Sequence, residues 1–271
     1  MTPPRRALIL SSLFPWPSLE GYIAELSVSN VGGDEPVPPI TSKRKFHNYV
    51  TVQEIKHLID SRRAKVLAFD LDGTTAFTEV DQMTQFAALT SELSGVRLSF
   101  DDVAREMLGK TPTDIMSIFK ARYDLPHNLQ DLVAERSKRY YASIKASSDE
   151  GKVRPNAFVL DLLHYAKGNL ENPPIVVSNG FQKIQTGLLR HWGIADLFGV
   201  VHTCDTMKLK LPLNERKVAF ARELPEVYGV KPSEVLFFDD SQGMINAVED
   251  AGLTGVYVKH VFNAPFRPQS G

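Results

Sequence analysis

The sequence predicts an α/β fold: a doubly wound, Rossmann-like parallel sheet forms the core, and a helical cap domain is inserted into it. Three observations predict this fold. Short apolar runs alternate along the chain with helical patterns. The strongest runs are apolar at every position, which is typical of strands covered on both faces in a parallel sheet. Between the first two strands, about 75 residues carry helical patterns only, far more than a crossover connection needs.

Each strand is expected where a short apolar run is bounded by polar or turn residues. The clearest run is Lys65-Val66-Leu67-Ala68-Phe69, and the runs at 174–177 and 235–238 are equally apolar. Two weaker runs, at 200–202 and 255–258, complete the expected sheet. Because helical patterns separate the runs, the strands are expected to be parallel.

Helices are expected before the first strand and between the strands. The expected segments are 52–61, 80–94, 99–108, 113–122 and 128–146, with further helical patterns at 159–163 and 218–222. These assignments predict three parts of the chain. They are an irregular N-terminal arm at 1–50, an α/β core at 51–76 and 150–271, and an inserted helical cap at 77–149.

The N-terminal arm is rich in Pro, Ser and Gly and has no strong periodicity, which is typical of irregular structure. Its first residues resemble the start of a secretory signal, because Arg5 and Arg6 precede the apolar run at 7–10. However, Pro15 and Pro17 interrupt that run early, and no small-residue cleavage site follows. We therefore prefer a surface extension to a targeting segment.

The composition excludes several classes of protein. The chain has 271 residues, of which 43% are hydrophobic and 23% charged, so a disordered, collagen-like or coiled-coil chain is excluded. A formal net charge of −1 provides no field that attracts nucleic acid or anionic lipid, and no apolar run is long enough for a membrane span. The single cysteine, Cys204, excludes an internal disulfide and a cysteine-rich zinc site, and it favours a reducing, cytoplasmic compartment.

Polar and acidic residues follow the three clearest strands. Ligands of an open parallel sheet bind beyond the carboxyl ends of its strands. This edge is expected to gather Asp70 and Asp72 after the first strand, Ser178 after the second, and Asp239 and Asp240 after the third. Two unit charges 4 Å apart repel by about 4 kcal/mol at an effective dielectric constant of 20, so several carboxylates need a cation. Oxygen ligands alone favour a hard cation such as Mg²⁺.

These strand ends resemble the signatures of the haloacid dehalogenase superfamily, in its lidded phosphatase branch. Asp70-Leu71-Asp72-Gly73-Thr74 is similar to the first signature, Asp-x-Asp-Gly-Thr. Ser178 with Asn179 is similar to the second, a Ser or Thr that closes a strand, and Asp239-Asp240 to the fourth, an acidic pair. Because three motifs occur in order across about residues 64–262, the likeness is specific.

The resemblance implies a role for each of these residues. Asp70 would be the nucleophile that forms an aspartyl-phosphate, and Asp72 would be the general acid and then the base. Ser178, with Asn179 beside it, would bind the phosphoryl group. Mg²⁺ would be held by Asp70, the backbone carbonyl of Asp72, Asp240, and Asp239 directly or through water.

The third signature of the family is a lone lysine, for which the sequence offers two candidates. Some members place this lysine at a helix start, 23 residues before the second Asp of the acidic pair, and Lys217 has this spacing from Asp240. Lys210 precedes Asp240 by 30 residues and matches no family pattern. We therefore favour Lys217 over Lys210. The required chemistry is the same for either residue, because one cation must neutralise the phosphate.

Gly109-Lys110-Thr111 is similar to the end of a phosphate-binding P-loop, but the required earlier glycine is Ala104 and no strand precedes it. A P-loop is therefore rejected. The resemblance implies that a turn of this kind in the cap can face the substrate, so Lys110 is a candidate for substrate selectivity.

The predicted function is a Mg²⁺-dependent phosphatase, a phosphoric monoester hydrolase that acts on a small phosphorylated metabolite. A phosphomutase or phosphotransferase of the same superfamily is the alternative, because it shares the Asp-x-Asp pair. A non-catalytic docking module is a third possibility, but it would have lost a nucleophile or a metal ligand, and this sequence keeps them. The sequence does not indicate an oligomeric state.

Overall fold

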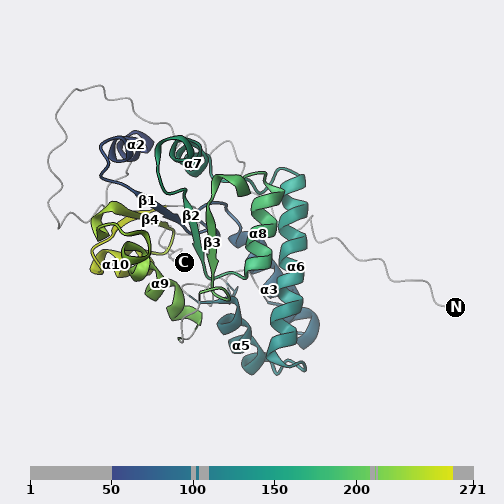
Figure 1. Ribbon diagram of the computed structural model, residues 1–271. Helices are drawn as coiled ribbons and strands as arrows, with labels where there is room; N and C mark the ends of the chain where they lie inside the picture. The colour runs from purple at the N-terminus through teal and green to yellow at the C-terminus, as the bar shows by residue number, and fades with distance from the viewer. Residues whose placement is uncertain (1–50, 99–101, 104–109, 208–210, 212, 259–271) are drawn as a thin grey trace, which may run out of the picture. The chain divides into compact units, whose positions relative to one another are not determined.

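Five parallel strands form one sheet in the order β3-β2-β1-β4-β5 (Figure 1). The strands are β1 Val66–Phe69, β2 Ile175–Ser178, β3 Val200–Thr203, β4 Val235–Asp239 and β5 Thr254–Tyr257. The computed structural model describes residues 51–98, 102–103, 110–207, 211 and 213–258. The predicted arm at 1–50 and most of the predicted helix at 99–108 lie outside these residues. The five predicted strands and the α/β fold class are confirmed.

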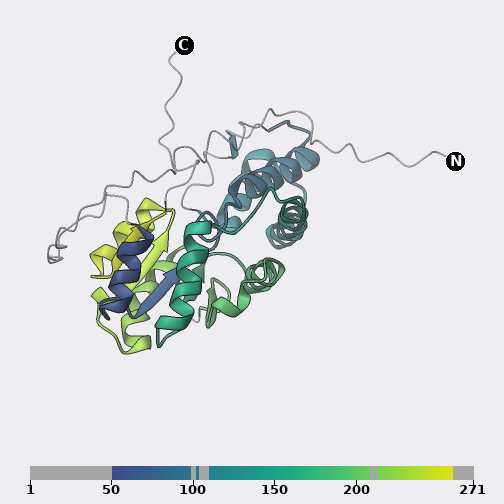
Figure 2. The same ribbon diagram turned by 90° about the horizontal axis from the view of Figure 1, so that it is seen from above.

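Helices cover both faces of the sheet (Figures 1 and 2). On one face the core includes α2 Val52–Asp60, α7 Ala157–Asn169 and α8 Gln182–His191. On the other face it includes α9 Leu213–Tyr228 and α10 Gln242–Asp250. Side chains of β1 alternate between the two faces, since Leu67 and Phe69 belong to the first cluster and Val66 and Ala68 to the second. All four are fully buried, as a continuously apolar strand requires.

The strand register brings the carboxyl ends of β1, β2 and β4 to one edge. Phe69, the last residue of β1, is paired with Val176 on β2 and with Phe238 on β4. The rings of Phe69 and Phe238 are stacked, with centroids 4.3 Å apart. Burial of one such side chain stabilises a fold by about 1.5–3 kcal/mol. This packing therefore fixes the two strands directly before Asp70 and Asp239.

Within the described residues, three of the helices between β1 and β2 pack on one another (Figures 1 and 2). They are α3 Glu79–Ser94, α5 Pro112–Tyr123 and α6 Leu129–Asp149. They share a separate apolar cluster, which includes Phe86, Phe119 and Leu132. The rings of Phe86 and Phe119 meet edge to face, with centroids 6.1 Å apart. These helices thus have an apolar cluster of their own, and the inserted helical cap with its boundaries 77–149 stays a prediction.

Helix α6 also packs against the α/β core. Tyr140 and Ile144 of α6 belong to the core cluster on the α7 and α8 face. The indole Nε1 of Trp192, just after α8, donates to Ser148 Oγ at 2.9 Å. The helical segment is thus connected to the sheet through one of its own helices.

One helix is longer than the sequence predicted. The helical pattern expected at 218–222 lies within α9, which runs from Leu213 through Pro225 to Tyr228. Proline lacks an N–H and so removes one hydrogen bond, but its φ angle suits a helix, and α9 continues past it. Among the described residues, no helix is long and apolar enough to cross a membrane.

Candidate active site

The loop after β1 is held in a tight turn by its own backbone and by Thr75. Thr75 Oγ1 donates to the Asp70 carbonyl at 2.6 Å, and the amides of Thr75 and Ala76 donate to the Leu71 carbonyl. Gly73 lies in the left-handed region at φ +83°, where other residues are strained. A Cβ atom at Gly73 would also lie 2.5 Å from Asp240 Oδ2. This close approach explains the glycine in the first motif.

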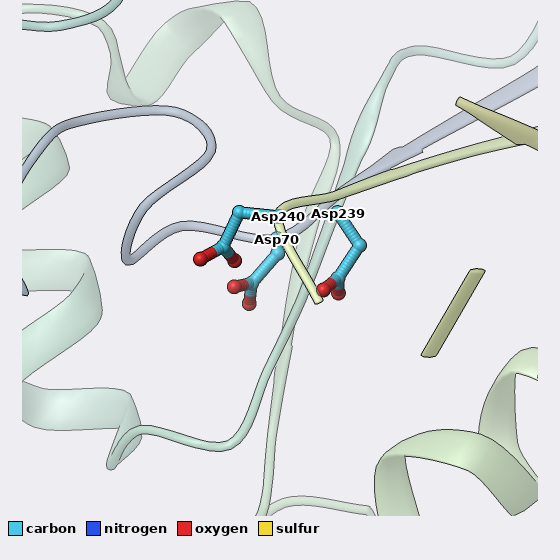
Figure 3. A group of neighbouring side chains, drawn as sticks. All are labelled: Asp70, Asp239 and Asp240. Carbon is cyan, nitrogen blue, oxygen red and sulfur yellow. The ribbon is translucent and has the colours of Figure 1, made fainter. Parts of the chain in front are cut away.

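Three carboxylates meet at the ends of β1 and β4, as Figure 3 shows. Asp70, Asp239 and Asp240 each place an oxygen within 4.8 Å of the oxygens of the other two. The ammonium of Lys217, on α9, lies 2.8 Å from Asp70 Oδ1 and 2.6 Å from Asp239 Oδ2. Lys217 is only 6% exposed. Lys217 therefore connects the last residue of β4 to the residue that follows β1.

Burial determines the electrostatics of this cluster. It raises the pKa of Asp70 well above its usual range, and the attraction of Lys217 only partly opposes it. Burial raises the pKa of Asp239 for the same reason. For Lys217, burial alone would lower the pKa, but the charges of Asp239 and Asp70 outweigh it and the pKa is raised. Lys217 is therefore a permanent cation, and two buried carboxylates, Asp70 and Asp239, share it.

The carboxylate of Asp72 is half-buried and bound by a different set of groups. Its Oδ1 accepts hydrogen bonds from Thr78 Oγ1, at 2.6 Å, and from the Tyr140 hydroxyl of α6. Its Oδ2 accepts from Gln185 Nε2 of α8 at 2.8 Å. Burial, and after it the neighbouring Asp72, raises the pKa of Tyr140 well above its usual range, so this phenol remains a donor. Asp70 and Asp72 thus occupy two distinct environments.

The second predicted motif lies at the end of β2. Ser178 is 1% exposed, and its Oγ accepts from the Gly180 amide at 3.0 Å, which leaves its hydroxyl hydrogen for a ligand. Asn179 Oδ1 is buried and has no hydrogen-bond partner among the described residues. A Cβ atom at Gly180 would lie 1.8 Å from Gln185 Nε2, so only glycine leaves room for the amide that reaches Asp72.

The structure brings together most of the predicted site residues. Asp70, Asp239, Asp240 and Lys217 form one cluster. The Asp72 side chain is not part of that carboxylate group, and the metal-ligand role expected of its backbone carbonyl stays a prediction. Lys210 lies outside the described residues. Lys110 is exposed beside Thr111, the N-cap of α5.

Sequence reasoning missed three residues that bind Asp72: Thr78, Tyr140 and Gln185. Thr78 lies only six residues after Asp72, so its closeness in the sequence is a signal that could have identified it. Tyr140 and Gln185 lie 68 and 113 residues away along the chain and carry no motif. Only the packing of α6 and α8 brings them to the site.

The carboxylate cluster fits a divalent cation. Asp70 and Asp239 are buried, Asp240 is half-buried, and all three offer the oxygen ligands that Mg²⁺ prefers. One ammonium does not balance three carboxylates in a site with little water. The donor set and its charge therefore agree with the predicted Mg²⁺ ligands.

The family is decided by comparison with known proteins. The model of the haloacid dehalogenase-like hydrolases matches residues 64–252. The chain belongs to this family. The resemblance stated from the three motifs is confirmed, as is the prediction that the chain is a hydrolase.

Relatives of the chain include phosphatases. The chain is 28% identical over 194 residues to the fructose-1-phosphate phosphatase YqaB of Escherichia coli K12, which covers 71% of this chain and 95% of that protein. The crystal structure of CbbY from Rhodobacter sphaeroides, in complex with phosphate, is similar with a TM-score of 0.62 and 19% identity, over 77% of this chain and 91% of that one. A predicted phosphoglycolate phosphatase from Haemophilus somnus gives a TM-score of 0.55 and 20% identity, over 72% and 85% of the two chains. The two structures are evidence for the fold alone.

Proposed function

We propose that this hydrolase is a Mg²⁺-dependent phosphatase of small phosphorylated metabolites, with an aspartyl-phosphate intermediate on Asp70. One observation carries the proposal: two carboxylates of one short loop lie in different environments. Asp70 is next to a lysine and two further carboxylates, whereas the described residues that bind the Asp72 side chain are all neutral donors. Two carboxylates in such different surroundings can take different roles, Asp70 as the nucleophile and Asp72 as the acid–base group.

In the first step, an oxygen of Asp70 attacks phosphorus and the bond from phosphorus to the leaving oxygen breaks. Asp72 gives its proton to that oxygen, so the product leaves as an alcohol and Asp72 becomes a carboxylate. Lys217 holds the nucleophile, since its ammonium is 2.8 Å from Asp70 Oδ1. The hydroxyl of Ser178 donates to a phosphoryl oxygen, because its hydrogen has no other acceptor among the described residues.

In the second step, Asp72 takes a proton from water as the water oxygen attacks phosphorus. The bond to Asp70 breaks, inorganic phosphate leaves, and both aspartates return to their starting states. Asp70, Asp239 and Asp240 would hold Mg²⁺, with the carbonyl of Asp72 as a further ligand. When bound, this ion offsets the negative charge of the phosphoryl group.

The relatives favour a sugar phosphate as substrate, since one of them is a fructose-1-phosphate phosphatase that aligns over 95% of its length. Lys110 is proposed to contribute to selectivity, because it lies in the segment between β1 and β2. The expected cytoplasmic location stays a prediction.

The Asp70→Asn variant tests the proposal, with sugar phosphates, phosphorylated acids and nucleotides as substrates and Mg²⁺ present. We expect phosphate release by the natural chain and a loss of at least about 10³-fold in the variant, since the amide cannot act as the nucleophile. Residual activity within tenfold of the natural chain would refute the covalent route. Isomerised substrate without stoichiometric phosphate would instead identify a phosphomutase.

A further inference from the structure

A chain of hydrogen bonds runs from a buried arginine on α6 to Asp72. Arg136 is 2% exposed, and its Nη2 donates to Gln82 Oε1 at 3.0 Å. Gln82 Nε2 donates to the Tyr140 hydroxyl at 3.4 Å, and that hydroxyl donates to Asp72 Oδ1. These hydrogen bonds therefore connect α3 and α6 to the loop after β1.

The direction of this chain is dictated by its first member. A guanidinium has donors and no acceptor, so it binds only the oxygen of the Gln82 amide. The amide nitrogen must then face Tyr140 and donate to its oxygen. The hydroxyl hydrogen of Tyr140 is left for Asp72 Oδ1. Every donor in the chain points toward the Asp72 carboxylate, and each bond strengthens the next.

Arg136 has no carboxylate partner within the part of the chain that the structure describes. Its guanidinium lies over the rings of Phe86 and Tyr140, at 4.2 and 4.6 Å from the centroids, and its Nε has no hydrogen-bond partner. A buried cation that forms no ion pair destabilises a fold unless other groups compensate, and the nearby charge of Asp72 acts in this direction. The hydrogen bond that Arg136 forms with the described residues is directed toward Asp72, through Gln82 and Tyr140.

The two oxygens of Asp72 are occupied unequally. An ionised carboxylate has about four acceptor positions, two on each oxygen. Thr78 and Tyr140 fill both positions of Oδ1, whereas Oδ2 accepts a single hydrogen bond from the described residues, that of Gln185. One position on Oδ2 is left for a substrate or a water molecule.

We infer that Tyr140 is a positioning residue for the proposed acid, and that the chain Arg136–Gln82–Tyr140 holds Oδ1 of Asp72 so that Oδ2 exchanges the proton with the leaving group. The inference rests on the proposed function, since it assigns a role to one atom of the proposed acid. Tyr140 itself keeps its proton. It acts through Asp72 and touches no reacting atom.

The test compares leaving groups. An alcohol of a sugar phosphate needs a proton as it leaves, whereas p-nitrophenolate is stable without one. In Tyr140→Phe we expect kcat/KM, which covers the steps up to departure of the leaving group, to fall about tenfold or more for an alkyl or sugar phosphate. For p-nitrophenyl phosphate it should change less than about threefold. Tyr141→Phe, on the same helix and with no hydrogen bond among the described residues, should change neither value.

A double-mutant cycle separates positioning from a structural role. If Tyr140 acts only through Asp72, then Tyr140→Phe adds no further loss to an Asp72→Asn variant. Equal losses on both esters, additive losses in the cycle, or an unchanged Tyr140→Phe enzyme would each overturn the inference. These outcomes leave the proposed function standing, because that function is tested separately by the Asp70→Asn variant. Melting temperatures near that of the natural chain would show that the variants fold.

Discussion

At the scale of single residues, Lys217 is the charge on which the carboxylate cluster depends. Its ammonium forms ion pairs with both Asp70 and Asp239, and all three residues are buried. Removing one partner of a buried ion pair leaves an uncompensated charge and costs about 3–5 kcal/mol of stability. The same ammonium is placed to stabilise charge on a transferring phosphoryl group.

We expect Lys217→Ala to lower kcat by at least about 10²-fold and also to lower the melting temperature. The control is Lys210→Ala, which removes the same charge from a residue that fits no family spacing and should keep near-natural rates. Phosphate-release kinetics and thermal unfolding of both variants measure the difference. A severe defect in Lys210→Ala with a mild one in Lys217→Ala would assign the third signature to Lys210.

At the scale of elements, the contact between α6 and α8 holds the helical segment near Asp72. Gly187 lies in α8, where a Cβ atom would be 2.9 Å from the ring of Tyr141 on α6. Glycine is unfavourable inside a helix, so its presence indicates that α6 needs the space. Gly168 in α7 is exposed, and a Cβ atom there would meet nothing within 4 Å.

These two helical glycines form a matched pair for substitution. We expect Gly168→Ala to raise the free energy of unfolding by up to about 1 kcal/mol, because alanine favours the helix. Gly187→Ala should lower it by about 1–3 kcal/mol, because the new methyl group overpacks the contact with Tyr141. Denaturant unfolding measures both values. Equal effects of the two changes would show that α6 and α8 are not in close contact in solution.

At the scale of the whole molecule, the site draws on elements from most of the described chain. The loop after β1 provides Asp70 and Asp72, the end of β4 provides Asp239 and Asp240, and α9 provides Lys217. A cation that binds this cluster binds the folded chain and not the unfolded one. Ligand binding of this kind stabilises the fold by RT ln(1 + [L]/Kd), about 2.7 kcal/mol at a hundredfold excess over Kd.

We therefore expect Mg²⁺ to raise the melting temperature, and a chelator to reverse the rise and stop phosphate release. Asp240→Asn should remove most of the increase, since it takes one carboxylate from the cluster. Glu171→Gln, a change at an exposed carboxylate outside the cluster, should leave it intact. A melting temperature that does not respond to Mg²⁺ would contradict the proposed metal site.

The sequence by itself determined the α/β class, the five strands and the family, because each depends on local patterns. Apolar runs identify strands buried on both faces, and Asp70, Asp72, Asp239 and Asp240 directly follow such runs. Parallel strands end at a common edge, so their neighbouring residues are brought together by topology alone. The spacing of Lys217 from Asp240 pointed to the lysine that the structure places against Asp70.

Only the tertiary structure decided which groups surround Asp72. Tyr140 and Gln185 are ordinary helical residues in the sequence, and Arg136 would be expected at the surface, yet all three are buried. Their positions depend on how α3, α6 and α8 pack, which is a property of interlocking side chains distributed over more than a hundred residues. A local sequence pattern does not predict such packing, because each contact joins residues that are far apart in the chain.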